Sequence, residues 1–223
     1  MLIESVLGEG GYIVPPKSFM KGLREICDKN GILLILDEVQ SGFGRTGKWF
    51  ALEHHEMVPD IIVAAKGIAS GLPLSGVFSS LDLMKKWDVG AHGGTYGGNV
   101  VACAAGVATI RAMREEKMLA NASERGIQLM TGLRKFQEEY PQIGDVRGLG
   151  LMIGTEFVVD GRPEKAKPMV KSLVHAAEEN DLLLLTCGTY DNTVRWIPPL
   201  NVTASQINEG LKIFGEALKK TVK

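Results

Sequence analysis

The feature that most constrains the fold of this chain is an apolar run that ends in two acids. Leu33 to Leu36 are all apolar, and Asp37 and Glu38 follow them directly. A short apolar run of this kind is typical of a buried strand. Burying an unpaired carboxylate is costly, so two interpretations remain. Either the acids cap a surface turn where the strand ends, or Asp37 meets a cation that something else supplies.

Strands and helices alternate along the first part of the chain, which favours the α/β class with a mostly parallel sheet covered by helices. A proline early and a glycine late suit the ends of a helix. We therefore expect a helix from near Pro16 to Gly31 and further helices over about 98–140. Strands are expected at 2–6, 32–37, 61–65 and 75–80.

A domain boundary is predicted within 140–150, where a proline and several glycines interrupt the helical pattern. The chain then divides into 1–142 and 143–223. The second part reads as a smaller α+β unit. Its expected elements are strands in "LMIGTEFV", "LLLLT" and "TVRWI", a helix over about 166–180, and a last helix from Thr203.

Composition excludes several classes of partner. With 45% hydrophobic and 23% charged residues and a formal net charge of -1, the chain has the make-up of an ordinary globular protein and no basic field for nucleic acid. No apolar run approaches the roughly 20 residues that span a bilayer. The three cysteines are scattered outside any CxxC spacing, which indicates neither a disulfide framework nor a zinc site. The adjacent His54 and His55 do not suggest a metal pair either, and we expect a cytoplasmic protein.

Lys66 repeats the anomaly of Asp37, because it directly follows the apolar run of "DIIVAAK". An ammonium at a strand end is commonly just solvated, but a desolvated lysine loses its proton more readily and can form a Schiff base with a carbonyl. Ligands of parallel sheets sit at the carboxyl ends of the strands. An acid and an amine at two such ends therefore favour a ligand site.

The blocks "GEGGYIVPP", "ILLILDEVQSGFGRTGKWFA", "PDIIVAAKGIASGLPLSG", "HGGTYGGN" and "VRWIPPLNVT" occur in this order. Together they resemble the class III pyridoxal-phosphate aminotransferases, the group with 4-aminobutyrate, acetylornithine and ornithine aminotransferases. The resemblance covers nearly the whole chain. It implies fold type I of pyridoxal-phosphate enzymes, with 1–142 as the C-terminal part of the large domain and 143–223 as the small C-terminal domain.

The resemblance also assigns roles in cofactor binding and catalysis. Asp37 would pair with the pyridine nitrogen of pyridoxal 5'-phosphate and keep it protonated, which answers why an acid ends this strand. Val39 would pack against one face of the ring, and Gln40 would hydrogen-bond the phenolic oxygen. Lys66 would form the covalent link to the cofactor and then serve as general base and acid. Glu38 is left as a structural residue.

Two further blocks imply contacts with a second subunit and with substrate. By composition, the glycine-rich stretch around Thr95 is a tight turn, and Arg195 is an outward-pointing strand residue. By resemblance, Thr95 contacts the cofactor phosphate of the neighbouring subunit of a homodimer, and Arg195 binds a substrate carboxylate. Glu9 would pair with Arg195 when no carboxylate is there. Ser5 and Leu7 depart from the proline and glutamine of many members, which leaves the subfamily open.

The reaction implied is transfer of an amino group from an amino acid to a 2-oxo acid. The "GEGGYIVPP" block favours an ω-amino donor such as 4-aminobutyrate, with 2-oxoglutarate as acceptor. Racemisation and the aminomutase reaction on glutamate semialdehyde use the same lysine and aspartate and stay open. Family members are longer, and the segment missing here would supply the phosphate loop and the second aromatic face of the ring. A truncated, non-catalytic fragment is therefore the other alternative, and we expect the 223-residue chain alone to be nearly silent.

Overall fold

The computed structural model describes residues 1–222, which form two compact units. Unit 1 consists of Met1–Ser5, Pro15–Gly44 and Lys48–Lys117. Unit 2 consists of Val6–Val14, Arg45–Gly47 and the chain from Met118 onward. Each unit has its own sheet and is described by itself.

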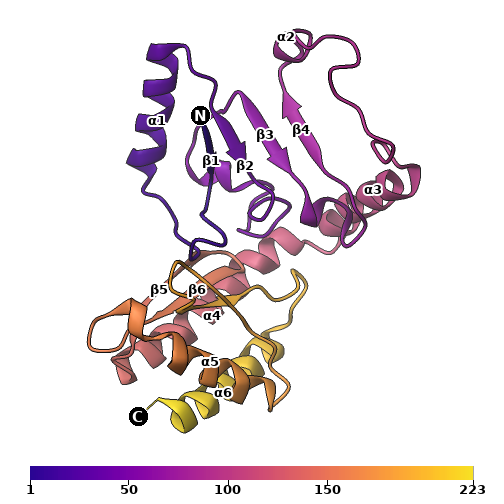
Figure 1. The fold of residues 1–223 in the computed structure, drawn as a ribbon. Coiled ribbons are helices and arrows are strands. Elements are labelled where there is room, and N and C mark those ends of the chain that lie inside the picture. The colour runs from indigo at the N-terminus through magenta and orange to yellow at the C-terminus, as the bar shows by residue number, and fades with distance from the viewer. Residues whose placement is uncertain (223) are drawn as a thin grey trace. The chain divides into compact units, whose positions relative to one another are not determined.

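The sheet of unit 1 is mostly parallel, as expected, with the strand order β1-β2-β3-β4. Its strands are β1 (Leu2–Glu4), β2 (Ile35–Asp37), β3 (Ile61–Ala64) and β4 (Gly76–Ser79), seen edge to edge in Figure 1. The first three run parallel, and β4 runs antiparallel to β3. A parallel strand needs a long crossover. Between β3 and β4 the chain makes only the short 3-10 helix η2 (Lys66–Ala69). The connection is too short for such a crossover, so the chain reverses direction and β4 pairs antiparallel with β3.

Helix α1 (Lys17–Asn30) supplies the apolar face that covers β1 and β2. It starts after Pro16 and ends where Gly31 turns left-handed with φ 63°, which confirms both predicted ends. Met20 and Cys27 of this helix are fully buried and belong to one apolar cluster with strand residues such as Leu36. The apolar run that precedes the two acids is therefore packed from this side.

The rest of unit 1 consists of short turns and one long helix. These are the 3-10 helix η1 (Ala51–His54), the short α2 (Leu81–Met84) and α3 (Val100–Glu115). Asn99 caps α3, because its side-chain oxygen accepts hydrogen bonds from the amides of Val101 and Ala102. Helix α3 packs against η2, and Gly106 allows this close approach: a Cβ there would lie 3.4 Å from the carbonyl oxygen of Ile68.

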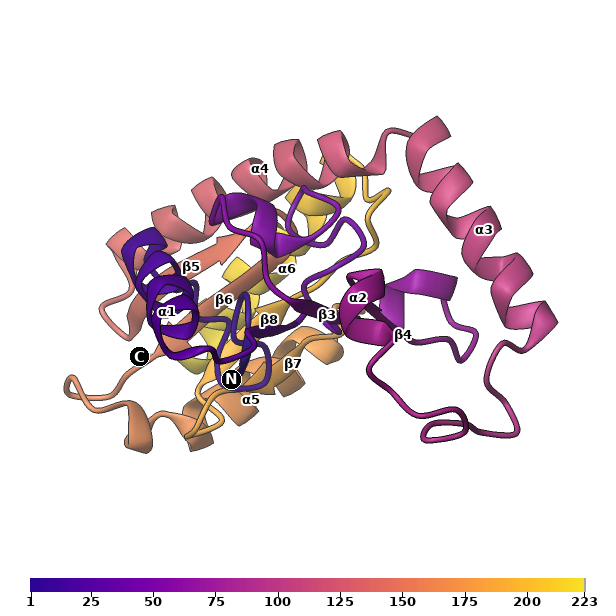
Figure 2. The same ribbon diagram turned by 90° about the horizontal axis from the view of Figure 1, so that it is seen from above.

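Unit 2 is built on an antiparallel sheet with the order β5-β6-β8-β7. The strands are β5 (Ile143–Leu149), β6 (Met152–Phe157), β7 (Leu185–Cys187) and β8 (Thr193–Trp196). The helices are α4 (Met118–Glu139), α5 (Lys167–Glu178) and α6 (Ala204–Thr221), with the 3-10 helix η3 (Pro163–Lys165). Helix α4 lies along β5 and β6, and α6 packs against α4 and α5 (Figures 1 and 2). One large apolar cluster joins these elements.

Strand β5 is the element that the sequence pattern missed. Its residues include Gly144, Asp145, Arg147 and Gly148, a mixture typical of a turn. The strand exists because β6 pairs with it along its length and because Val146, at 3% exposure, is buried in the core of unit 2. Tertiary pairing therefore overrides the local composition.

The contacts within this chain separate the units after Lys117, since α4 packs on the sheet of unit 2. The expected division of the family's domains at 142 and 143 stays a prediction. Among residues 1–222, no helix has both the length and the apolar character that crossing a bilayer requires.

Candidate active site

Asp37 and Lys66 lie at the carboxyl ends of two neighbouring parallel strands, at one edge of the sheet of unit 1. Asp37 is the last residue of β2 and stands opposite Val63 in β3, and Lys66 comes just after β3 ends. Hydrogen bonding continues one residue beyond the ladder, because the Glu38 amide donates to the Val63 carbonyl over 2.8 Å. The register thus brings the acid and the amine to the same carboxyl edge, where parallel sheets bind ligands.

A backbone amide of the turn after Asp37 holds the aspartate side chain in place. The amide of Val39 donates to Asp37 Oδ1 over 2.9 Å. Asp37, Val39 and Gln40 are all half-buried, so their side chains lie where a bound group can reach them. The segment "DEVQ" therefore forms a fixed turn at the sheet edge rather than a loose surface loop.

Lys66 has a strained backbone. Its φ is +35°, in the left-handed region that non-glycine residues rarely adopt, and such a conformation costs about 1–3 kcal/mol. The strain persists because the surroundings fix this turn: α3 packs on η2, and Gly67 lies against Phe43, with a Cβ there only 3.0 Å from Phe43 Cβ. Strain of this kind is concentrated at functional sites. The Lys66 side chain is exposed in this chain, so burial does not hold its amine away from water.

A hollow of about 570 Å³ lies beside Lys66, within the size range of small-molecule sites. The polypeptide that lines it is rich in glycine and proline, so its backbone can approach a ligand closely. The lining residues are Ala65, Lys66, Gly71, Leu72, Pro73, Leu74, Ser75, Tyr96, Gly97 and Gly98. Thr95 comes directly before Tyr96 in the sequence, lies in a turn and is exposed.

Glu9 and Arg195, the two expected substrate-binding residues, form an ion pair in unit 2. Arg195 Nη1 and Glu9 Oε1 are 2.5 Å apart. The arginine side chain, on β8, is 13% exposed, whereas that of the glutamate is 69% exposed. Arg195 therefore does not point outward, contrary to the pattern-based default. The carboxylate is the accessible partner of the pair.

The backbone around Glu9 is fixed, although its carboxylate is exposed. Gly188 donates its amide to the Glu9 carbonyl over 2.9 Å, and Arg147 Nη2 donates to the Gly11 carbonyl over 2.6 Å. Gly11 has φ 122°, a conformation that glycine adopts without strain. The backbone that carries Glu9 is therefore held in place, while its carboxylate faces solvent.

Sequence reasoning missed the buried groups around Arg195. Tyr12 is fully buried, and burial raises its pKa to about 12 although the Arg195 charge opposes this. Burial likewise raises the pKa of the Cys187 thiol to about 11. Burial lowers the pKa of Arg45, whose Nη1 donates to the carbonyls of Leu151 and Pro198. The sequence signal that could have pointed to Tyr12 is its place directly after the "GEGG" block, which contains Glu9.

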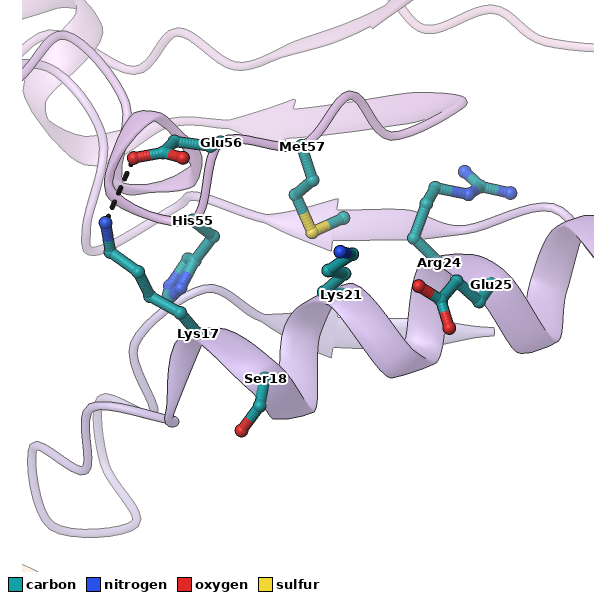
Figure 3. Close-up of a pocket in the computed structure, with 8 residues that line it drawn as sticks. All are labelled: Lys17, Ser18, Lys21, Arg24, Glu25, His55, Glu56 and Met57. Atoms are coloured by element: carbon teal, nitrogen blue, oxygen red, sulfur yellow. Dashed lines mark hydrogen bonds and ion pairs between the residues drawn. The ribbon is translucent and has the colours of Figure 1, made fainter.

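A second hollow of unit 1, about 420 Å³ in volume, lies between α1 and the turn after η1 (Figure 3). It is lined by Lys17, Ser18, Lys21, Arg24, Glu25, His55, Glu56 and Met57. Lys17 pairs with Glu56 and Arg24 with Asp60, which makes this a solvated ionic surface rather than an anion site. In the part of the chain that the structure describes, no three histidine, cysteine or acidic residues gather as a metal site would require.

Comparison with known proteins decides the family. The family model described as "Aminotransferase class-III" matches residues 1–218. This chain belongs to the class III aminotransferases. The 5-aminovalerate aminotransferase of Pseudomonas aeruginosa is 45% identical over 97% of this chain and 51% of its own length. The 4-aminobutyrate aminotransferase of Escherichia coli is 42% identical over the same shares, 97% and 51%.

Solved structures agree with this class III assignment. An amine transaminase from an uncultivated Pseudomonas species, in its PLP-bound form, matches with a TM-score of 0.91 and 34% identity over 99% of this chain and 52% of its own. The ornithine aminotransferase of Toxoplasma gondii matches with a TM-score of 0.90 and 32% identity over 99% and 50%. These neighbours confirm a partial fold type I architecture. The chain spans about half the length of the curated relatives it matches.

The candidate residues of this class III chain fall into two groups. Asp37, Val39, Gln40 and Lys66 gather at the sheet edge of unit 1, with Thr95 next to the same hollow. Glu9 and Arg195 form the pair in unit 2. The roles of these residues stay predictions.

Proposed function

We propose that the protein to which this chain belongs is a pyridoxal-phosphate-dependent aminotransferase that moves an amino group from an ω-amino acid to a 2-oxo acid. The observation that supports this most strongly is the register of β2 and β3, which brings an acid and a backbone-strained lysine to one sheet edge. Membership of the class III family supports the reaction class.

The residues at this edge fit pyridoxal phosphate by their chemistry. The cofactor has a basic ring nitrogen, which calls for an acid, and an aldehyde, which calls for an amine. Asp37 and Lys66 are these two groups, and the hollow beside Lys66 is large enough for a small cofactor. Backbone amides and a hydroxyl suffice to bind a phosphate, and the exposed turn of Thr95 offers such groups to the phosphate of a neighbouring subunit. When bound, the cofactor supplies an electron sink for the substrate carbon.

The chain's own residues would then divide the work. Asp37 would hold the proton on the ring nitrogen, and Lys66 would link to the cofactor and later carry the proton to and from the substrate carbon. Val39 would pack on the ring, and Gln40 would donate to its phenolic oxygen. Thr95 would bind the phosphate of a neighbouring subunit, which makes a homodimer part of the proposal.

The Glu9–Arg195 pair supports the choice of substrates. An ω-amino acid carries no carboxylate on the carbon that bears its amine, so Arg195 can stay paired with Glu9 while this donor reacts. A 2-oxo acid such as 2-oxoglutarate has a carboxylate next to the reacting carbon, and Arg195 would bind it after Glu9 swings out. The relatives named for 5-aminovalerate and 4-aminobutyrate make these ω-amino acids the first donors to test.

Borohydride reduction of the protein with pyridoxal phosphate, followed by peptide mapping, tests the site. We expect a pyridoxyl group on Lys66 and its loss in Lys66→Arg. Lys48→Arg, which also lies in unit 1, serves as control and should keep the label. A label on any other lysine would refute the assignment of Lys66. Glutamate formation from 2-oxoglutarate with 4-aminobutyrate or 5-aminovalerate then tests the substrates.

A further inference from the structure

Glu38 is a buried carboxylate with a complete set of neutral donors. The residue is 1% exposed, although it directly follows the half-buried Asp37. Its Oε1 accepts from Ser5 Oγ over 2.6 Å and from the Leu52 amide over 2.8 Å. Its Oε2 accepts from Ser41 Oγ over 2.5 Å and from the Ala51 amide over 3.0 Å. The donors are two hydroxyls and two backbone amides, so a charge is buried here by hydrogen bonding.

The backbone of Glu38 is fixed as firmly as its side chain. Its amide donates to Val63 of β3 over 2.8 Å, and its carbonyl accepts from the Gly42 amide over 2.9 Å. A Cβ on Gly42 would lie 2.8 Å from that carbonyl oxygen, so only glycine fits at this distance. Glu38 thus joins the segment after β1, strand β3, the loop at 41–42 and η1 at a single point.

Contacts from neighbouring residues hold the donors of Glu38 in place. His55 Nε2 lies 3.0 Å from the Ser5 carbonyl oxygen and carries the proton of this bond, because a carbonyl can only accept. His55 is 5% exposed, and its ring lies beside the first turn of α1 (Figure 3). Ser5 and Ser41 are both buried as well. The donors of Glu38 are therefore preorganised rather than recruited from mobile side chains.

A scaffold alone does not require a charge at this position. Well-packed apolar residues commonly replace buried ionic groups with no loss of stability. What a carboxylate adds is direction: two oxygens accepting two bonds each fix the orientation of the segment that carries them. Successive side chains of an extended segment point to opposite sides. Fixing Glu38 on the interior side therefore fixes the opposite aim of Asp37.

We propose that Glu38 is a positioning residue for the cofactor site, and that it acts by locking the turn Asp37–Gln40. This inference rests on the proposed function, because the group toward which Asp37 is aimed is the ring nitrogen of pyridoxal phosphate. Loosening the four-donor set of Glu38 lets Asp37 turn away. The positive charge on the ring nitrogen is then less stabilised, and the proton on the linked Lys66 nitrogen meets less repulsion.

The test uses the protein loaded with pyridoxal phosphate and the variants Ser5→Ala, Ser41→Ala, the double variant and Glu38→Gln. Ser18→Ala, an exposed serine of α1, is the matched control. For the double variant we expect the pH midpoint of the cofactor absorbance to rise by roughly 0.5 unit or more. We also expect kcat to fall roughly 10- to 100-fold with little change in KM. Glu38→Gln should change both the absorbance midpoint and kcat more than the double variant does, because the glutamine NH2 group would face a backbone N–H donor.

The outcomes separate the two proposals. If borohydride places no pyridoxyl group on Lys66 of the unaltered protein, the proposed function and this inference both fail. If Lys66 is labelled but the serine variants lose only thermal stability, with absorbance midpoint and kcat matching Ser18→Ala, Glu38 is structural and the inference alone is overturned. Should Glu38→Gln not fold, the single serine variants, each retaining three of the four donors, decide the question.

Discussion

Replacing Arg195 with lysine is the most direct test of how the substrate acid is recognised. Lysine keeps the positive charge but loses the planar fork of donors that binds a carboxylate through two parallel bonds. We expect Arg195→Lys to weaken catalysis with 2-oxoglutarate strongly and catalysis with an ω-amino donor only slightly. Under the proposed function, the donor half of the reaction would leave this side chain paired with Glu9.

The structure sets the expected magnitude. The Arg195 side chain is 13% exposed, so a carboxylate that it binds is largely withdrawn from water. A charge-assisted hydrogen bond in such a setting contributes about 1.5–3 kcal/mol. Losing one of the two hydrogen bonds to the substrate carboxylate therefore lowers kcat/KM for 2-oxoglutarate roughly 10- to 150-fold. Displacing Glu9 costs less, about 1 kcal/mol at most, because its carboxylate is 69% exposed and screened by solvent.

Steady-state kinetics of the two half-reactions is the assay. Arg162→Lys is the matched control, since this arginine of unit 2 is 51% exposed and pairs with Asp160 at the surface. The control should leave kcat/KM unchanged for both substrates. Equal losses for 2-oxoglutarate and for a simple primary amine in Arg195→Lys would show that Arg195 only packs unit 2, and the reasoning about recognition would fail.

The remaining predictions concern stability. In a urea titration, Gly126→Ala should lower the free energy of unfolding by about 3 kcal/mol, because a Cβ there would overlap the backbone of Gly150. The control Gly22→Ala should be neutral or stabilising, because nothing lies within 4 Å of a Cβ at Gly22. Tyr12→Phe should be neutral or stabilising by about 1 kcal/mol, because among the described residues the buried Tyr12 hydroxyl has no hydrogen-bond partner. Tyr12 and Cys187 have folded pKa values of about 12 and 11, above their ordinary values of 10.0 and 9.0, so the unfolded chain releases these protons first as pH rises. The free energy of unfolding should therefore fall between pH 9 and 12, and Tyr12→Phe should reduce this loss. If the free energy of unfolding of the variant falls with pH as steeply as that of the unaltered protein, the raised pKa of Tyr12 is not a cause of the loss.

Local patterns predicted most elements of the chain. Pro16 and Gly31 predicted both ends of α1, and Thr203 predicted the start of α6, because capping depends on a few neighbouring residues. Strand β5 escaped prediction, because its glycines and charges look like a turn until β6 pairs with them. Elements defined by partners far along the chain are not visible in their own composition.

The sequence alone determined the chemistry of the candidate site: an acid and an amine that each follow an apolar strand, in blocks that resemble one family. Tertiary structure decided how these groups are held. The register of β2 and β3 places Asp37 and Lys66 at one edge, and the left-handed turn at Lys66 depends on packing by α3. Of two adjacent acids, the fold buries Glu38 among four donors from three separate segments and leaves Asp37 accessible. No local pattern could make that distinction, because the donors that stabilise a buried charge come together only when the chain folds.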